Sequence, residues 1–69
     1  MKQIIEIKGM SCAHCVMHVK EALMEIEGIT EVEVDLEKNT ATILSNEEIK
    51  KEIIVEAIEN VGYQVLHIK

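Results

Sequence analysis

The sequence has no proline, tryptophan or phenylalanine, and Tyr63 is its sole aromatic residue. The core is therefore expected to consist of Ile, Val and Leu side chains. Arginine is also missing: every basic residue is Lys, and Asp+Glu 13 against Lys+Arg 7 gives a net charge of -6. Nucleic-acid binding is disfavoured, because it needs a basic surface and usually uses bidentate arginine contacts. A partner with a basic docking face fits this charge better.

No apolar run is long enough for a signal peptide or a membrane span, which predicts a cytoplasmic chain without membrane insertion. A chain this short cannot divide its core, so residues 1–69 are expected to form a single domain. The initial Met and the end soon after the last expected strand favour a free-standing protein over an excised domain. In a reducing cytosol, two cysteines are expected to form a metal or redox pair rather than a structural disulfide.

Alternating apolar residues predict four strands, and apolar residues at helical spacing predict two helices. The expected elements are a strand at Lys2–Lys8, a helix from Cys15 that Gly28 stops, strands at 31–36 and 40–44 joined by a turn at 37–39, a helix from Ile49 to Gly62 and a strand at 64–68. Right-handed crossovers in this order give an α+β, ferredoxin-like βαββαβ sandwich, a four-stranded antiparallel sheet with both helices on one face.

Two features of the second helix are also predicted. The run Ser45-Asn46-Glu47-Glu48 resembles a capping box at its start. Ile53, Ile54 and Val55 are consecutive and apolar, so one of them is expected at the surface, although the sequence does not say which.

Cys12 and Cys15 lie where the first strand passes into the first helix. A spacing of three residues lets both sulfur atoms converge above the helix N-terminus, where unpaired backbone N–H groups favour negative charge. Cysteines in that position ionise readily, and the thiolate is the form that binds metal. The pair is therefore the predicted metal site.

The ligand set favours Cu(I), because two thiolates suit a soft ion whereas structural Zn(II) takes four ligands. Hg(II) also accepts two thiolates, so the residues leave it open. A two-coordinate ion on a surface loop can be attacked by a third thiolate and passed on by ligand exchange. The sequence offers neither an acid–base pair set in a cleft nor a phosphate loop, so no enzyme is expected.

The run Gly9-Met10-Ser11-Cys12-Ala13-His14-Cys15 resembles the GMTCxxC signature of heavy-metal-associated domains, in particular the small bacterial copper chaperones of the CopZ type. Only Ser11 departs from it. The resemblance spans essentially the whole chain, including Ile58–Tyr63. It implies Cu(I) held by Cys12 and Cys15, Met10 packed beneath the loop, and delivery to a copper-transporting P-type ATPase or a copper-responsive repressor. In the family, the position of Tyr63 adjoins the metal loop and is commonly Tyr in bacterial members.

Several residues near the predicted metal site can be interpreted in more than one way. His14 could tune the thiolates, contact the metal or bridge a second chain, or it could be a solvated loop residue. His18 could be a third ligand for Zn(II), or a solvent-facing helix residue. Met10 is expected to be a hydrophobic plug rather than a thioether ligand. Met17 and Met24 could form an apolar patch for a partner, or lie at the edge of the core.

Three functions therefore compete: a copper carrier, a thiol-redox or Zn(II)/Hg(II)-handling module, and a regulatory domain of a heavy-metal ATPase. A thioredoxin-like enzyme is disfavoured, because proteins of that family have longer chains, an aromatic residue before the motif and a cis-proline. This sequence has no tryptophan, phenylalanine or proline. We expect the apo form to be a monomer, and shared thiolates could bridge two copies when metal is bound. The sequence does not give the copper affinity or choose between the two delivery partners.

Overall fold

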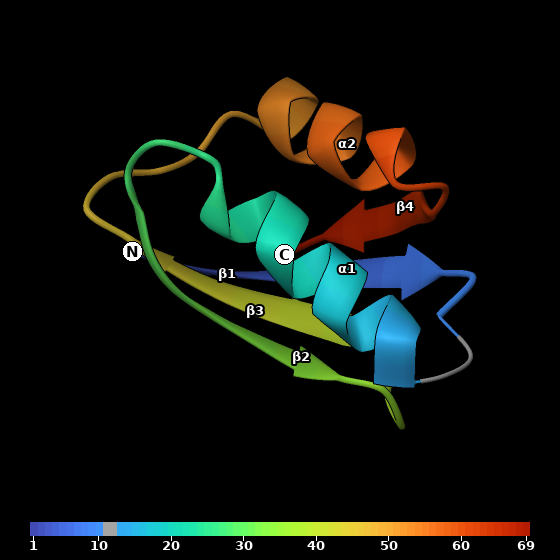
Figure 1. Cartoon of the computed structure of the whole chain (residues 1–69). Coiled ribbons are helices and arrows are strands. Elements are labelled where there is room, and N and C mark those ends of the chain that lie inside the picture. The colour runs from blue at the N-terminus through green and yellow to red at the C-terminus, as the bar shows by residue number, and fades with distance from the viewer. Residues whose placement is uncertain (11–12) are drawn as a thin grey trace.

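Six helices and strands follow one another in the computed structural model, which describes residues 1–10 and 13–69. In chain order they are β1 (Lys2–Lys8), α1 (Ala13–Met24), β2 (Ile29–Asp35), β3 (Thr40–Ser45), α2 (Lys51–Asn60) and β4 (Gln64–Ile68). The order is the one predicted from the alternation of apolar residues (Figure 1).

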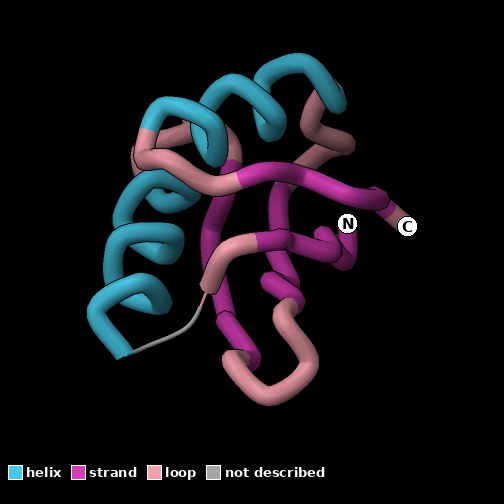
Figure 2. Tube along the Cα trace, turned by 90° about the vertical axis from the view of Figure 1, so that its right-hand side faces the viewer, coloured by secondary structure: helices cyan, strands magenta, loops and turns pink. Residues whose placement is uncertain are grey.

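The four strands form one antiparallel sheet in the order β2-β3-β1-β4. Both helices cover the same face of this sheet (Figure 1), and the view turned by 90° separates the layer of helices from the layer of strands (Figure 2). The predicted α+β, ferredoxin-like sandwich is confirmed. Because β1 is a central strand, the segment that follows it leaves the middle of the sheet and leads directly into α1.

The core between the two layers is aliphatic, as the shortage of aromatic residues predicts. Its largest fully buried side chains are Ile5, Ile7, Leu23, Ile43, Ile54, Ile58 and Val19. Burying one side chain of this size contributes about 1.5–3 kcal/mol. The core therefore fixes α1 and α2 against the sheet.

Several element boundaries differ from the prediction, among them the starts of α1 and β2. α1 begins at Ala13 rather than at Cys15, so His14 belongs to the helix and not to the loop. β2 begins at Ile29, earlier than predicted. A bulge between Ile29 and Glu31 shifts the register, so that Ile29 and Val32, three residues apart, are both buried. Strict alternation could not reveal that bulge. Leu36 lies beyond the end of the strand and is exposed.

The capping-box prediction for residues 45–48 is wrong. α2 begins at Lys51, and Lys50 at its start makes no side-chain capping bond. Ser45 closes β3 instead, and its hydroxyl donates a hydrogen bond to the carbonyl oxygen of Glu47 at 2.6 Å. The serine therefore stabilises the turn out of the strand, and its oxygen does not serve the helix.

A glutamine on β1 anchors the segment that leads into α2. The N–H of Ile49 donates to the Gln3 side-chain oxygen at 3.1 Å, and the Gln3 amide nitrogen donates to the Ile49 carbonyl at 3.3 Å. This pair satisfies both backbone groups of a buried residue that lies outside any helix or strand.

The consecutive apolar residues of α2 divide as expected, with one at the surface. Ile54 is fully buried and Val55 is half-buried, whereas the side chain of Ile53 is 46% exposed. Within residues 1–10 and 13–69, the structure contains no helix that is both long and apolar enough to cross a membrane.

Candidate metal-binding site

The first turn of α1 presents the one predicted metal ligand that the structure describes. Cys15 is the third residue of this helix, is half-buried, and packs against the hydrophobic core. Cys12 lies outside the described residues. Cys15 therefore lies in the helix turn whose backbone N–H groups have no partners within the helix, a position that favours a negative charge.

The electrostatics of this helix end favour an anion. The first turn of α1 carries no acidic residue, so no side chain of that turn neutralises the partial positive charge of the helix N-terminus. A thiolate, or a metal–dithiolate complex that is negative overall, would be stabilised there by about 0.3–1 kcal/mol when solvent-exposed.

The backbone on the strand side of the site is held by Gly9 and Met10. Gly9 has a φ of +107°, a conformation that side-chain-bearing residues rarely adopt. A Cβ atom at this position would meet the Cδ1 atom of Tyr63 at 3.3 Å. Met10 follows, is only 6% exposed and belongs to the core cluster. The packing of Met10 is what the plug interpretation predicts, and it fixes the entry to the loop.

Tyr63 lies between α2 and β4, far from Gly9 in the sequence but close to it in the fold. Its half-buried ring packs against the core. The resemblance led us to expect Tyr63 beside the loop, but the tight approach to Gly9 was not foreseen. The sign of it in the sequence is the glycine that follows β1, because a glycine there can mean that another residue comes too close to the backbone for a side chain to fit.

The three histidines are all at the surface. His14 and His18 are exposed and lie on α1, one turn apart, whereas His67 is exposed on β4. Among residues 1–10 and 13–69, no group of three or more His, Cys, Asp or Glu side chains is arranged to hold a metal ion. Any site that includes His14 or His18 would therefore have to be completed by Cys12, by solvent or by another molecule.

Comparison with known proteins supports a relation to metal-binding domains. Residues 4–64 match the model of a family described as the heavy-metal-associated domain. The chain is 42% identical over 65 residues to the copper chaperone CopZ of Enterococcus hirae, a match that covers 93% of this chain and 94% of that protein. It is 45% identical over 60 residues to the mercuric reductase of Shewanella putrefaciens, where the match covers 87% of this chain and 11% of the reductase.

Solved structures give the same picture. A CopZ metallochaperone superposes with a TM-score of 0.89 at 33% identity, over 96% of this chain and 100% of that one. A copper-binding domain from HMA7, a P-type ATPase, superposes with a TM-score of 0.84 at 32% identity, over 100% of this chain and 99% of that one.

Proposed function

The chain belongs to the heavy-metal-associated domain family, and on this premise we propose that it is a carrier that binds Cu(I) between the thiolates of Cys12 and Cys15. The observation that carries the proposal is the match along 94% of the length of a copper chaperone. A relation of this extent supports a metal-carrier role for the domain formed by residues 1–69, which we propose acts in the cytoplasm without catalysing a reaction of its own.

The chemistry of the proposed site follows from charge and softness. Two thiolates and one Cu(I) ion give a complex with a net charge of minus one, which the N-terminus of α1 is placed to stabilise. Two sulfur ligands satisfy a soft monovalent ion. A two-coordinate ion leaves further coordination positions for an incoming ligand.

Transfer is proposed to occur by ligand exchange. A thiolate of the partner forms a new bond to copper, which passes through three-coordination, and one bond to Cys12 or Cys15 then breaks. A second exchange moves the ion completely, and the copper keeps its oxidation state throughout. The partner we propose is a metal-transporting P-type ATPase, because a copper-binding domain of one such ATPase shares this fold at 32% identity. A copper-responsive repressor is the alternative recipient.

Met10 and Tyr63 are proposed to support the site without binding the ion. Met10 is buried and Tyr63 packs beside Gly9, so both fix the backbone on the strand side of the loop. His14 and His18 project to solvent, and we place them outside the Cu(I) ligand set.

A second candidate function is the handling of Hg(II), favoured by the 45% identity to part of a mercuric reductase. Hg(II) also takes two thiolates, so the same two cysteines would hold it. Competition between the two ions for the reduced protein, followed by mass spectrometry, distinguishes a copper carrier from a mercury-binding domain by which ion remains bound in the presence of cellular thiols.

The proposed ligands are tested by anaerobic titration with Cu(I) against a chromophoric competitor, using the wild type and the variants Cys12→Ser and Cys15→Ser. Each variant is expected to lose at least about 100-fold in affinity, roughly 2.7 kcal/mol, because a hydroxyl is a poor ligand for a soft ion. His18→Ala, also on α1, serves as the matched control and should bind as the wild type does. Tight binding that survives both cysteine substitutions would end the proposal.

A further inference from the structure

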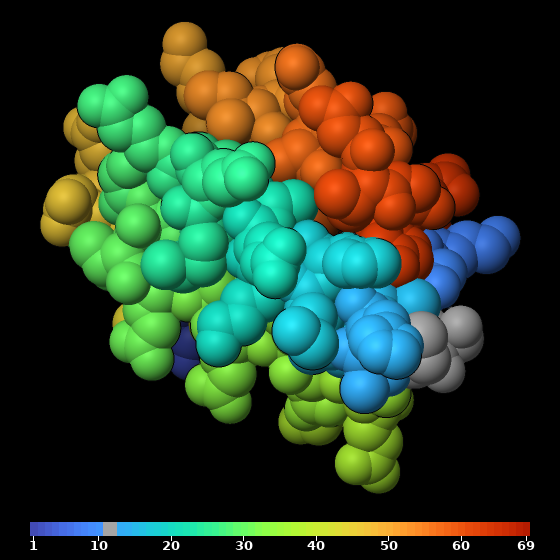
Figure 3. All heavy atoms as spheres, in the orientation of Figure 1, coloured from blue at the N-terminus to red at the C-terminus, as the bar shows by residue number. Residues whose placement is uncertain are grey.

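A groove runs between α1 and α2 on the outer side of the helical layer. The space-filling view from this side shows the two helices meeting along a seam (Figure 3). The groove has a volume of about 440 Å³ and is lined from His18 to Ile26 on the α1 side and from Ile53 to Val61 on the α2 side.

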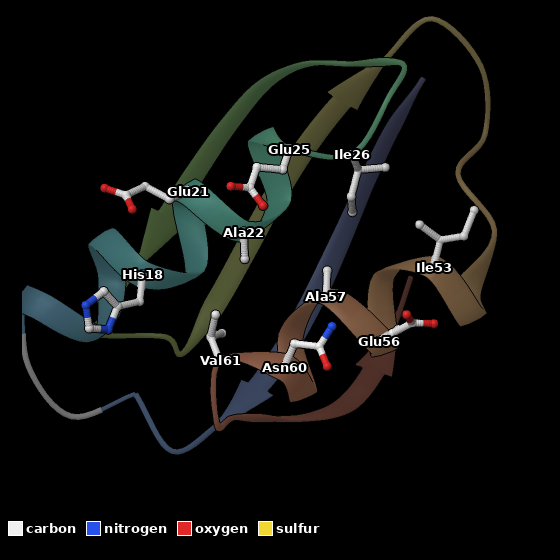
Figure 4. A pocket seen from close by; sticks show the side chains of 10 residues that line it. All are labelled: His18, Glu21, Ala22, Glu25, Ile26, Ile53, Glu56, Ala57, Asn60 and Val61. Carbon is white, nitrogen blue, oxygen red and sulfur yellow. The ribbon is translucent and has the colours of Figure 1, made fainter.

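The floor of this groove is apolar. Ala22 of α1 points toward Ala57 and Val61 across the gap between the helices (Figure 4). Ile53 also lines it and is 46% exposed, and Val61 is 36% exposed. Apolar area is thus left open to water beside an otherwise well-buried core, and covering it would release free energy roughly in proportion to that area.

The sides of the groove are negative. Glu21 from α1, Glu25 just beyond its end and Glu56 from α2 line it (Figure 4), and no lysine is among its lining residues. The Glu25 N–H donates to the carbonyl oxygen of Glu21 at 3.2 Å, so the two residues lie one helical turn apart, and like charges at this spacing repel one another. A cation seated between the carboxylates would relieve this repulsion.

We propose that this groove is the docking site for a protein segment that presents an aliphatic side chain flanked by lysines or arginines, on one face of an amphipathic helix. The apolar floor accepts the aliphatic side chain, and the carboxylates pair with the flanking cations. A second copy of this chain does not fit, because it carries a net charge of -6. An anionic membrane is repelled for the same reason.

Cys15, the proposed copper ligand among the described residues, does not line the groove. The docking proposal can therefore be wrong while the copper-binding proposal holds. The probe is therefore a labelled synthetic helical peptide of leucine and lysine, with leucines at i, i+3, i+4 and i+7, measured by fluorescence anisotropy on the reduced, metal-free full chain. A Cys12→Ser/Cys15→Ser variant is expected to bind this peptide as the wild type does, and loss of binding there would overturn the proposal.

The charge requirement is tested by Glu21→Gln/Glu25→Gln/Glu56→Gln. Peptide affinity is expected to fall at least about tenfold, because the groove loses its three carboxylates. The matched control is Glu31→Gln/Glu33→Gln/Asp35→Asn on β2, which changes the net charge equally at exposed positions and should weaken binding by less than about twofold. Equal losses in the two variants would mean attraction to net charge alone and would overturn the proposal.

The apolar requirement is tested by Ile53→Ser, with Leu66→Ser on β4 as control, since Leu66 is 58% exposed and lies outside the groove. The first should weaken peptide binding about fivefold, and the second should leave it unchanged. Amide chemical shifts are expected to change along α1 and α2. Shifts confined to the sheet, tighter binding to anionic vesicles than to the peptide, or self-association through this face in sedimentation experiments would each contradict the assignment.

Discussion

At the scale of single residues, the approach to the proposed metal loop contains a glycine that has a tyrosine ring beside it. Gly9 combines a positive φ with a neighbour where a Cβ atom would lie, the Cδ1 atom of Tyr63 at 3.3 Å. Gly62 also has a positive φ of +92°, but nothing lies within 4 Å of its Cβ position. Comparing substitutions at the two glycines therefore separates the free-energy cost of backbone strain from the cost of side-chain crowding.

Substituting Gly9→Ala is expected to destabilise the protein by about 1–2 kcal/mol from backbone strain, plus a few tenths from the contact with the ring. Gly62→Ala should show only the cost of backbone strain. The free energy of unfolding of both variants is measured by urea unfolding. Combining Gly9→Ala with Tyr63→Ala tests the contact, because the crowding term should then disappear. Identical losses for the two glycines would show that the ring moves aside without penalty.

The burial of Met10 could be predicted from the sequence, whereas the exposed residue on α2 could not. Met10 was predicted to be buried because the residue before a surface loop needs an anchor, and it is 6% exposed. The exposure of Ile53 rather than Ile54 could not be chosen, because both fall on the apolar arc of the helix. That choice depends on how α2 is rotated against β4 and α1, which is set by tertiary packing.

At the scale of elements, α1 positions Cys15 in its first turn and leaves that turn free of acidic side chains. The helix start could not be placed by apolar periodicity, because Ala13 and His14 are exposed and contribute nothing to the apolar stripe. The start of α2 was misplaced for a related reason. Ser45 and the two glutamates after it look like a cap, but the segment is held by bonds to β1 that no local pattern reveals.

The electrostatic role of α1 predicts that Ala13→Glu weakens Cu(I) binding about two- to fivefold, because a carboxylate in the first turn competes for the partial positive charge that stabilises the copper–dithiolate anion. Ala13 is exposed, so the fold should tolerate the change. Ala13→Gln is the isosteric control and should bind as the wild type does. The difference should shrink in high salt, and equal affinities of the Glu and Gln variants at low salt would argue against any contribution from the helix end.

At the scale of the whole molecule, the fold separates two tasks. The sheet and the aliphatic core fix the end of β1 and the start of α1, while the outer seam of the helices stays open and negatively charged. The βαββαβ order could be predicted because the strands and helices have clean periodicities. The seam could not, because it arises only when two helices distant in the sequence pack side by side.

The central claim is that one copper ion is held by two sulfur atoms of this chain and by no histidine. X-ray absorption spectroscopy of the protein loaded with one equivalent of Cu(I) tests it directly. We predict a Cu(I) edge and a first shell fitted by two sulfur scatterers alone, unchanged in a His14→Ala/His18→Ala variant. A first shell that contains nitrogen or oxygen and changes in that variant would contradict the account.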